Sequence, residues 1–330
     1  MNKYKDFFKN RTVLVTGATG FIGTNLIRRL LDHEANLRAV VYKKEPKIKY
    51  DQVDYVNADL TNKNDCLKVT KDVDFVFMCS ANSSGAAVIE KEPLTHLTPN
   101  VIMNALMLEA SYFNDVKKFI FISSNTVYPV TNFPVTEEDV DYTFFDKYHI
   151  VGWMKLFSEE MCKMYSQKIS KPMKTLIVRP GNIYGQYDKF NKKESKVIAA
   201  IVRRFAENEN PLTVWGDGND LKDFIFIDDF VHGLIDAAIS NIEGPINICS
   251  GESITIKDVI SELKSISGKD HLTVNYDSSK PSMIPVRLMS NSYVKKELNF
   301  EAKTSLREGL KKTYDWYKIF YSNKKPEDLE

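Results

Sequence analysis

The sequence lacks an excess of charge of either sign and contains no long apolar run. Its 330 residues include 45 basic and 44 acidic side chains, a formal net charge of +1. Nucleic acids and anionic membrane surfaces bind strongly basic chains, so neither is an expected partner. No apolar run reaches the roughly 18 residues that span a membrane, and residues 1–6 lack the apolar core of a secretory signal. We therefore expect a soluble, cytoplasmic protein.

Cysteine is scarce and scattered. The four cysteines are Cys66, Cys79, Cys162 and Cys249, and no two of them form a Cys-x-x-Cys pair. The histidines are not spaced to place two ligands on one face beside a carboxylate. The sequence thus predicts neither a disulfide framework nor a metal site, and a chain of this length can bury a stable core without them.

Short apolar runs rich in β-branched and aromatic residues alternate with helical patterns over the first half of the chain. The runs lie at residues 12–15, 37–42, 53–56, 75–78, 119–122 and 175–178. Strands that are apolar throughout are buried on both faces, which is typical of a parallel sheet covered by helices. The sequence therefore predicts an α/β fold with a Rossmann-type, doubly wound parallel sheet.

The pattern becomes less regular beyond Pro180. Glycine, asparagine and proline interrupt it at residues 181–191 and 211–221. We expect two interleaved domains, a dinucleotide-binding one and a smaller, substrate-binding one. Their expected bounds are residues 1–178 with 222–248 for the first, and residues 179–221 with 249–330 for the second.

A glycine-rich loop, TGATGFIG at residues 16–23, follows the first apolar run and opens a helix. Glycine lets the backbone approach a pyrophosphate closely, and a helix N-terminus offers free N–H donors and the positive end of its dipole. The loop therefore predicts a dinucleotide site. Its expected members are Gly17, Thr19, Gly20, Phe21, Ile22 and Gly23.

The end of the second run indicates which dinucleotide is bound. An acid there would accept hydrogen bonds from the ribose of NAD, but this chain has Tyr42, Lys43 and Lys44. Two lysines suit a 2′-phosphate, so NADP is favoured, with NAD still possible. Asp59 and Leu60, after the third run, are candidates for the adenine edge, and a solvated loop aspartate is the competing interpretation.

Seven segments in order resemble the extended short-chain dehydrogenase/reductase family, also described as NAD-dependent epimerases/dehydratases, and most closely its GDP-L-fucose synthases. They are TGATGFIG at 16–23, NDVKKFIFISS at 114–124, RPGNIYGQYDKF at 179–190, VWGDGNDLKDFIFIDDF at 214–230, INICSGESITI at 246–256, SKP at 279–281 and SLREGLKKTYDWY at 305–317. The resemblance implies an NAD(P)-dependent enzyme that acts on a nucleotide-linked sugar, GDP being favoured over UDP or dTDP.

The resemblance also assigns catalytic roles. Ser124, four residues before Tyr128, would hydrogen-bond the reacting oxygen, and Lys155 would be the lysine of the family's Tyr-x-x-x-Lys pair, which holds the nicotinamide ribose. The tyrosine of that pair, the usual proton donor, is replaced by Val151, which has no proton to give.

Four groups remain as candidate proton donors. Tyr148 lies seven residues before Lys155, on almost the same face of a helix but about 10 Å along it. Ser124 acting through a water, Thr126 and Lys196 are the others. Thr126 and Lys196 stand where fucose synthases have an epimerising cysteine and histidine, so we expect epimerisation beside the ketone to be lost. Dehydration is disfavoured because Asn125 and Thr126, rather than an Asp-Glu pair, follow Ser124.

Further binding residues follow from the resemblance. The additional cofactor-binding candidates are Ser80, Ala81, Asn82, Asn100, Lys155, Pro180, Asn182 and Ile183. The substrate-binding candidates are Ser84, Ser124, Asn182, Val197, Arg204, Trp215, Lys222, Lys280 and Arg287.

Hydride transfer alone remains as the expected chemistry. The leading hypothesis is a 4-keto-sugar reductase or sugar 4-dehydrogenase acting on a GDP-linked hexose or heptose in surface-glycan biosynthesis. A nucleotide-sugar 4-epimerase with retained NAD and a catalytically impaired, cofactor-binding sensor are the alternatives. The resemblance implies a homodimer through the helices near 101–113 and 150–167. Apolar residues there suit either a dimer or the core, namely Met103, Leu106, Met107 and Ala110.

Overall fold

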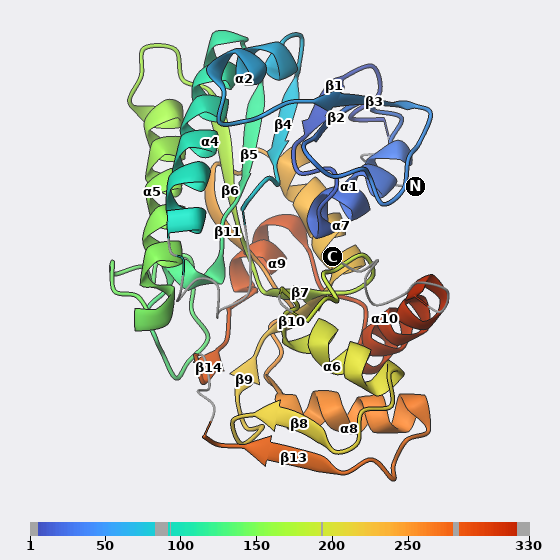
Figure 1. Cartoon of the computed structure of the whole chain (residues 1–330). Coiled ribbons are helices and arrows are strands. Elements are labelled where there is room, and N and C mark those ends of the chain that lie inside the picture. Colours follow the sequence, from blue (N-terminus) through green and yellow to red (C-terminus); the bar gives the residue numbers. More distant parts are fainter. Residues whose placement is uncertain (1–5, 83–91, 93, 193, 280–283, 322–330) are drawn as a thin grey trace.

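The computed structural model describes residues 6–82, 92, 94–192, 194–279 and 284–321. Its main feature is a seven-stranded sheet in the order β11-β6-β5-β4-β1-β2-β3 (Figure 1). The strands are β1 (Thr12–Val15), β2 (Asn36–Val41), β3 (Val53–Asn57), β4 (Phe75–Met78), β5 (Lys118–Ile122), β6 (Lys174–Pro180) and β11 (Gly244–Ile248). Every neighbouring pair is parallel, which confirms the predicted fold class.

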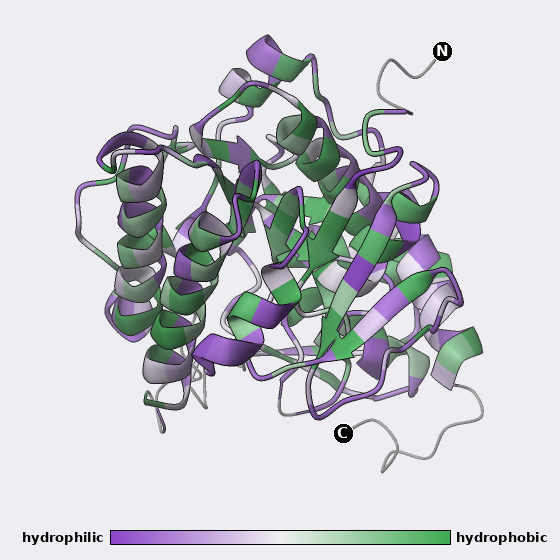
Figure 2. Cartoon of the chain, turned by 90° about the horizontal axis from the view of Figure 1, so that it is seen from above, coloured by the Kyte–Doolittle hydropathy of each residue, from purple (hydrophilic) through white to green (hydrophobic). Residues whose placement is uncertain are grey.

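Helices cover both faces of this sheet, as the apolar strands predict. The face that carries Val13 and Phe77 packs against α1 (Phe21–Leu31) and α7 (Ile227–Ile239). The opposite face, which carries Leu14 and Val76, packs against α2 (Lys63–Thr70), α4 (Leu94–Phe113) and α5 (His149–Gln167). Successive residues of one strand thus enter two cores, because side chains alternate across a strand. Hydrophobic colours mark the central strands in Figure 2, with hydrophilic residues on the outer helix faces.

A second group of elements lies below the carboxyl ends of the main strands in Figure 1. It contains α6 (Val197–Ala206), α8 (Ile256–Ser267), α9 (Ser292–Leu298) and α10 (Leu306–Tyr321). Its strands are β7 (Asn182–Tyr184), β8 (Leu212–Trp215), β9 (Leu221–Lys222), β10 (Phe224–Phe226), β12 (Ile254–Thr255), β13 (Val274–Asp277) and β14 (Val286–Arg287), which form small sheets. We keep the two-domain division as a proposal, with this group as the substrate-binding part except for residues 222–226, which the predicted bounds assign to the dinucleotide-binding domain.

An aromatic cluster fixes the loop that leads from β7 toward α6. The Phe190 ring is buried and lies 4.9 Å from the ring of Tyr317 and 5.7 Å from that of Trp316, centroid to centroid. The Tyr187 ring packs edge-on against Trp316 at 4.8 Å. Helix α10 therefore holds residues 187–190 in place, just before the start of α6.

Among the described residues, no helix is long and apolar enough to cross a membrane. Over the same part of the chain, no group of three or more His, Cys, Asp or Glu side chains could hold a metal ion.

Candidate active site

The glycine-rich loop lies where the strand order reverses, since β1 has β2 on one side and β4 on the other. Gly17 has a φ of +65°, and a Cβ there would lie 2.9 Å from the carbonyl oxygen of Cys79. A Cβ on Gly23 would lie 2.2 Å from the Gly17 oxygen. The loop can therefore follow this path only with glycine at both positions. The first turn of α1, which follows the loop, carries no acidic side chain that would repel an anion. This arrangement fits a dinucleotide pyrophosphate.

The partners of the loop hold it against the end of β4. The Thr16 hydroxyl oxygen accepts hydrogen bonds from the backbone N–H groups of Cys79 and Ser80, both at 3.0 Å. Thr19, Phe21 and Ile22 are partly exposed along the loop and the start of α1.

After β2, the Tyr42 hydroxyl donates a hydrogen bond of 3.0 Å to Asp59. The other Asp59 oxygen accepts hydrogen bonds from the backbone and hydroxyl of Thr61, which lower the pKa of the Asp59 carboxyl. Asp59 is thus held by hydrogen bonds from Tyr42 and Thr61, and Leu60 beside it is buried. Lys43 and Lys44 are exposed, and the Lys43 ammonium lies 4.7 Å from the centre of the Tyr42 ring.

The turn after β4 is held by Asn100 of α4. Its amide oxygen accepts from the Asn82 N–H at 2.8 Å, and its amide nitrogen donates to the Asn82 carbonyl at 3.0 Å. Asn100 is buried, so it shapes the backbone beside Ser80 and Ala81. Of the other cofactor candidates, Pro180 is the last residue of β6, and Ile183 is buried in β7. Two predicted substrate residues, Ser84 and Lys280, lie outside the described residues.

Ser124 and Thr126 form a hydroxyl pair immediately after β5, in the short helix η1 (Asn125–Val127) and its cap. The Ser124 oxygen accepts hydrogen bonds from the Thr126 hydroxyl at 2.9 Å and from the Thr126 N–H at 3.2 Å. With both acceptor positions used, the Ser124 proton is left to be donated to another oxygen.

Lys155, in the second turn of α5, reaches the same strand end. Its ammonium donates a hydrogen bond of 2.8 Å to the carbonyl of Ile122 and lies 4.8 Å from the centre of the Phe121 ring. Burial lowers its pKa to about 8, and the nearby Glu159 charge opposes that shift. The predicted pair of Ser124 and Lys155 thus comes from one strand end and the helix packed against it.

Gly152 explains how close α5 comes to η1. A Cβ at this position would lie 2.6 Å from the carbonyl oxygen of Thr126 and 2.5 Å from a ring carbon of Phe144. The first turn of α5 therefore makes backbone contact with the Ser124–Thr126 segment. Val151, the neighbour of Gly152, offers no hydroxyl there.

Tyr148 immediately precedes α5, which begins at His149. Its ring centroid lies 6.1 Å from that of Phe145, and no hydrogen-bond partner of its hydroxyl is found among the described residues. Burial raises the pKa of Tyr148, the opposite of what acid/base catalysis near neutral pH needs. The structure does not connect Tyr148 to Lys155 by any contact in the described part of the chain.

Lys196 is exposed and immediately precedes α6. Its charge lowers the pKa values of both Lys155 and the buried Asp188, whose carboxyl pKa is raised overall by burial. The substrate half therefore brings a second lysine close enough to Lys155 for the two charges to interact.

The substrate-side candidates differ in whether a polar atom or an exposed surface remains for a ligand. Val197 and Trp215 are 39 % and 54 % exposed, and Arg287 holds the carbonyls of Tyr128 and Pro129 with its two Nη atoms. The Arg287 Nε atom is buried and has no partner within the described residues, so one donor remains for an anion. The other group already has protein partners: Asn182 donates to the Asp223 carbonyl, Arg204 pairs with Glu209 and the Thr213 carbonyl, and Lys222 pairs with Asp220 and the Ile284 carbonyl.

Sequence reasoning missed a buried ion pair beneath this site. Arg179 and Glu159 bind each other with two hydrogen bonds, and the Ser123 hydroxyl donates to the same Glu159 carboxylate. The sequence did contain one indication of this pair: Glu159 follows Lys155 by four residues, which places both on one face of a helix.

We predict that Gly152→Ala lowers the free energy of unfolding by about 1–3 kcal/mol, because the added methyl group meets the Thr126 backbone, which cannot rotate away. Urea denaturation measures the loss. Lys163→Ala, a partly exposed position on the same helix, serves as the control and should change the stability by no more than about 0.5 kcal/mol. Equal stability of Gly152→Ala and the unmodified protein would contradict the close approach of α5 to η1.

Comparison with known proteins agrees with this geometry. The GDP-mannose 3,5-epimerase of Arabidopsis thaliana is 29 % identical over 318 residues, covering 94 % of this chain and 83 % of the relative. The GDP-L-fucose synthase 1 of the same plant is 27 % identical over 326 residues, with 94 % of each chain covered.

Among solved structures, UDP-glucuronic acid 4-epimerase from Bacillus cereus, in complex with UDP-glucuronic acid and NAD, is similar with a TM-score of 0.82 and 27 % identity. The match covers 94 % of this chain and all (100 %) of that one. Residues 13–249 match the NAD-dependent epimerase/dehydratase family as a whole. Because that match spans well over half of the sequence, and the expected glycine loop, serine and lysine lie together within it, the chain belongs to the NAD-dependent epimerase/dehydratase family.

Proposed function

We propose that this protein is an NADP-dependent nucleotide-sugar oxidoreductase, a 4-keto-sugar reductase or sugar 4-dehydrogenase acting on a GDP-linked hexose or heptose in surface-glycan biosynthesis. The observation that carries this proposal is the hydroxyl pair of Ser124 and Thr126 beside the Lys155 ammonium. These groups can serve an oxygen that gains or loses a proton, without the tyrosine that Val151 replaces.

The proton route follows from the hydrogen bonds of the pair. Bound NADPH would supply the hydride to the carbonyl carbon of the sugar. Ser124 would donate its proton to the carbonyl oxygen as that oxygen becomes an alcohol, and Thr126 would restore the Ser124 proton through their 2.9 Å hydrogen bond. Solvent would then reprotonate Thr126. In the direction of oxidation, each proton moves the opposite way.

Lys155 would anchor the cofactor in this scheme. One of its three N–H groups is used by the Ile122 carbonyl, so two remain for ribose hydroxyls, as the family resemblance implies. Lys196 is the competing proton donor because its charge reaches Lys155 from the substrate side. Tyr148 is less favoured because burial raises its pKa.

NADP is the favoured cofactor because the exposed Lys43 and Lys44 stand at the end of β2, where NAD enzymes have a carboxylate. Asp59, fixed by Tyr42 and Thr61, would accept from the adenine amino group. NAD stays the alternative, since the Bacillus cereus relative is a complex with NAD.

A nucleoside diphosphate suits the substrate side. Trp215 is an exposed aromatic platform, and the unpartnered Nε of Arg287 is a buried donor suited to a phosphate oxygen. The names of the Arabidopsis relatives support GDP as the nucleotide.

A nucleotide-sugar 4-epimerase with retained NAD is the second candidate function, because the solved relative above bears that kind of name. Such an enzyme would also need Ser124 and Lys155, but would leave the redox state of its cofactor unchanged after each turnover. A catalytically impaired sensor is less favoured, since a sensor needs neither group.

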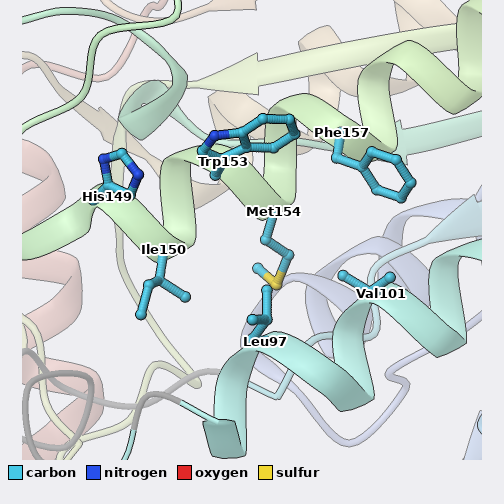
Figure 3. Close-up of a pocket in the computed structure, with 7 residues that line it drawn as sticks. All are labelled: Leu97, Val101, His149, Ile150, Trp153, Met154 and Phe157. Carbon is cyan, nitrogen blue, oxygen red and sulfur yellow. The ribbon is translucent and has the colours of Figure 1, made fainter.

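We also propose a homodimer formed by α4 and α5, and the structure decides which of the two roles left open by the sequence the four apolar residues play. Met107 and Ala110 are buried in the core, and Met103 and Leu106 pack against it, so these four serve the fold of a single chain. An apolar groove lies instead on the outer side of the helix pair, with a volume of about 310 Å³ (Figure 3). It is lined by Leu97 and Val101 of α4 and His149, Ile150, Trp153, Met154 and Phe157 of α5. Trp153 and Phe157 are 50 % and 39 % exposed, which suits contact with a second copy.

We predict that the protein oxidises NADPH when GDP-4-keto-6-deoxymannose is added, seen as a loss of near-ultraviolet absorbance. Lys155→Ala, measured in parallel, should show no loss, and NADH should react more slowly than NADPH. A redox-silent mixture in which the sugar is nevertheless isomerised would favour the epimerase, and an unchanged sugar and cofactor would count against the proposed substrate.

A series at the hydroxyl pair tests the proton route. Ser124→Ala should lower kcat by about 10²- to 10⁴-fold, because the oxygen loses its proton donor. Thr126→Val, which has the same shape without the hydroxyl, should lower kcat by about tenfold or more, whereas Thr126→Ser should retain most of it. If Thr126→Val matches the unmodified enzyme in kcat, Thr126 does not supply the proton, and Lys196 becomes the leading donor.

A further inference from the structure

A fully buried ion pair lies beneath the strand ends that carry the active site. The side chains of Arg179 and Glu159 are 2 % and 0 % exposed. Arg179 Nε lies 3.0 Å from one carboxylate oxygen of Glu159, and its Nη2 lies 2.6 Å from the other. A buried pair of this kind contributes little net stability, because both charges must leave water. Its position directly beneath Ser123, the neighbour of Ser124, points to a role in organising the active site.

The pair links the strand ends of the site to each other. The Ser123 hydroxyl donates to Glu159, and Ser123 is the residue immediately before Ser124. On its far side, Arg179 donates to the Tyr128 hydroxyl at 3.0 Å, which in turn donates to Asn247 of β11 at 2.6 Å. Helix α5 is thereby tied to the ends of β5, β6 and β11 by groups that water does not reach.

Glu159 also lies one helical turn after Lys155, on the same side of α5. The titratable groups that face the Lys155 ammonium are Glu159 and Cys162 of α5, Cys79 after β4, and Lys196 before α6. Burial and Lys196 both disfavour the charged ammonium, and Glu159 is the strongest influence in the other direction. The two cysteine thiols are neutral at physiological pH, because burial raises their pKa values.

We infer that Glu159 is a positioning residue, whose buried carboxylate keeps Lys155 charged against the Ile122 carbonyl and, through Ser123, fixes the strand end that presents Ser124. This inference rests on the proposed function for its purpose, since a charged Lys155 is what the ribose hydroxyls of the cofactor would meet. Arg179 is needed because a buried carboxylate without a partner of opposite charge is costly.

The test measures the titration of Lys155 in the full-length protein without cofactor or sugar. Competitive labelling with acetic anhydride between about pH 6 and pH 10 reports the neutral fraction of each lysine, with Lys155 read from its peptide by mass spectrometry. In Glu159→Gln the pKa of Lys155 should fall by about one unit relative to the unmodified protein, because the opposing anion is gone.

Two further variants keep the result interpretable. Glu159→Gln leaves Arg179 buried without a partner, so Glu159→Gln/Arg179→Met, which removes both charges, is measured as well and should show a smaller shift in the same direction. Tyr128→Phe breaks the far end of the network and leaves Glu159 in place, so it should leave the Lys155 titration unchanged.

An unchanged Lys155 titration in the folded Glu159 variants would overturn the inference, as would an equal shift in Tyr128→Phe. Because the measurement needs no turnover, a wrong substrate would not affect it. A protein that reduces the keto sugar but shows no shift would refute the role of Glu159 alone.

Discussion

The hydrogen bond from the Lys155 ammonium to the Ile122 carbonyl sets the geometry of the whole site. It requires α5 to lie close to the end of β5, and Gly152 permits this because it has no side chain to meet the Thr126 backbone. Once the helix is there, Ser124, Thr126 and Lys155 face the same edge of the sheet as the glycine loop. The placement of Ser124, Thr126 and Lys155 at one strand end therefore depends on this helix contact.

The proposed replacement of the family's tyrosine by Val151 changes what the remaining groups must do. A phenol beside a lysine would be both the proton donor and a partner of the ammonium. Without it, donation falls to the Ser124 hydroxyl, whose two acceptor positions are filled by Thr126, and Lys155 needs another group to keep it charged. The buried Glu159, itself balanced by Arg179, is placed to do this. These contacts keep Ser124, Thr126 and Lys155 organised without a hydroxyl at position 151.

The sequence predicted the sheet and the glycine loop because both depend on short-range patterns. Runs such as 75–78 and 119–122 are apolar throughout, and strands that are buried on both faces are typical of a parallel sheet covered by helices. The Arg179–Glu159 pair could not be found in this way, since it depends on which strand end packs against which turn of α5. The same limit explains why the sequence left Met107 and Ala110 open between the core and a dimer interface, because helical spacing alone cannot tell these two faces apart; the structure buries both. The sequence also could not show that two predicted substrate-binding cations, Arg204 and Lys222, pair with groups of the protein itself, because these pairs depend on the fold.

The central claim is that hydride passes between the nicotinamide and the sugar without a tyrosine. The most direct measurement uses NADPH that carries deuterium at the transferable position of the nicotinamide, with mass spectrometry of the sugar nucleotide after turnover. The account predicts that the sugar product contains the deuterium and that the cofactor is recovered as NADP. A sugar product without deuterium, formed while the labelled NADPH stays intact, would contradict the claim.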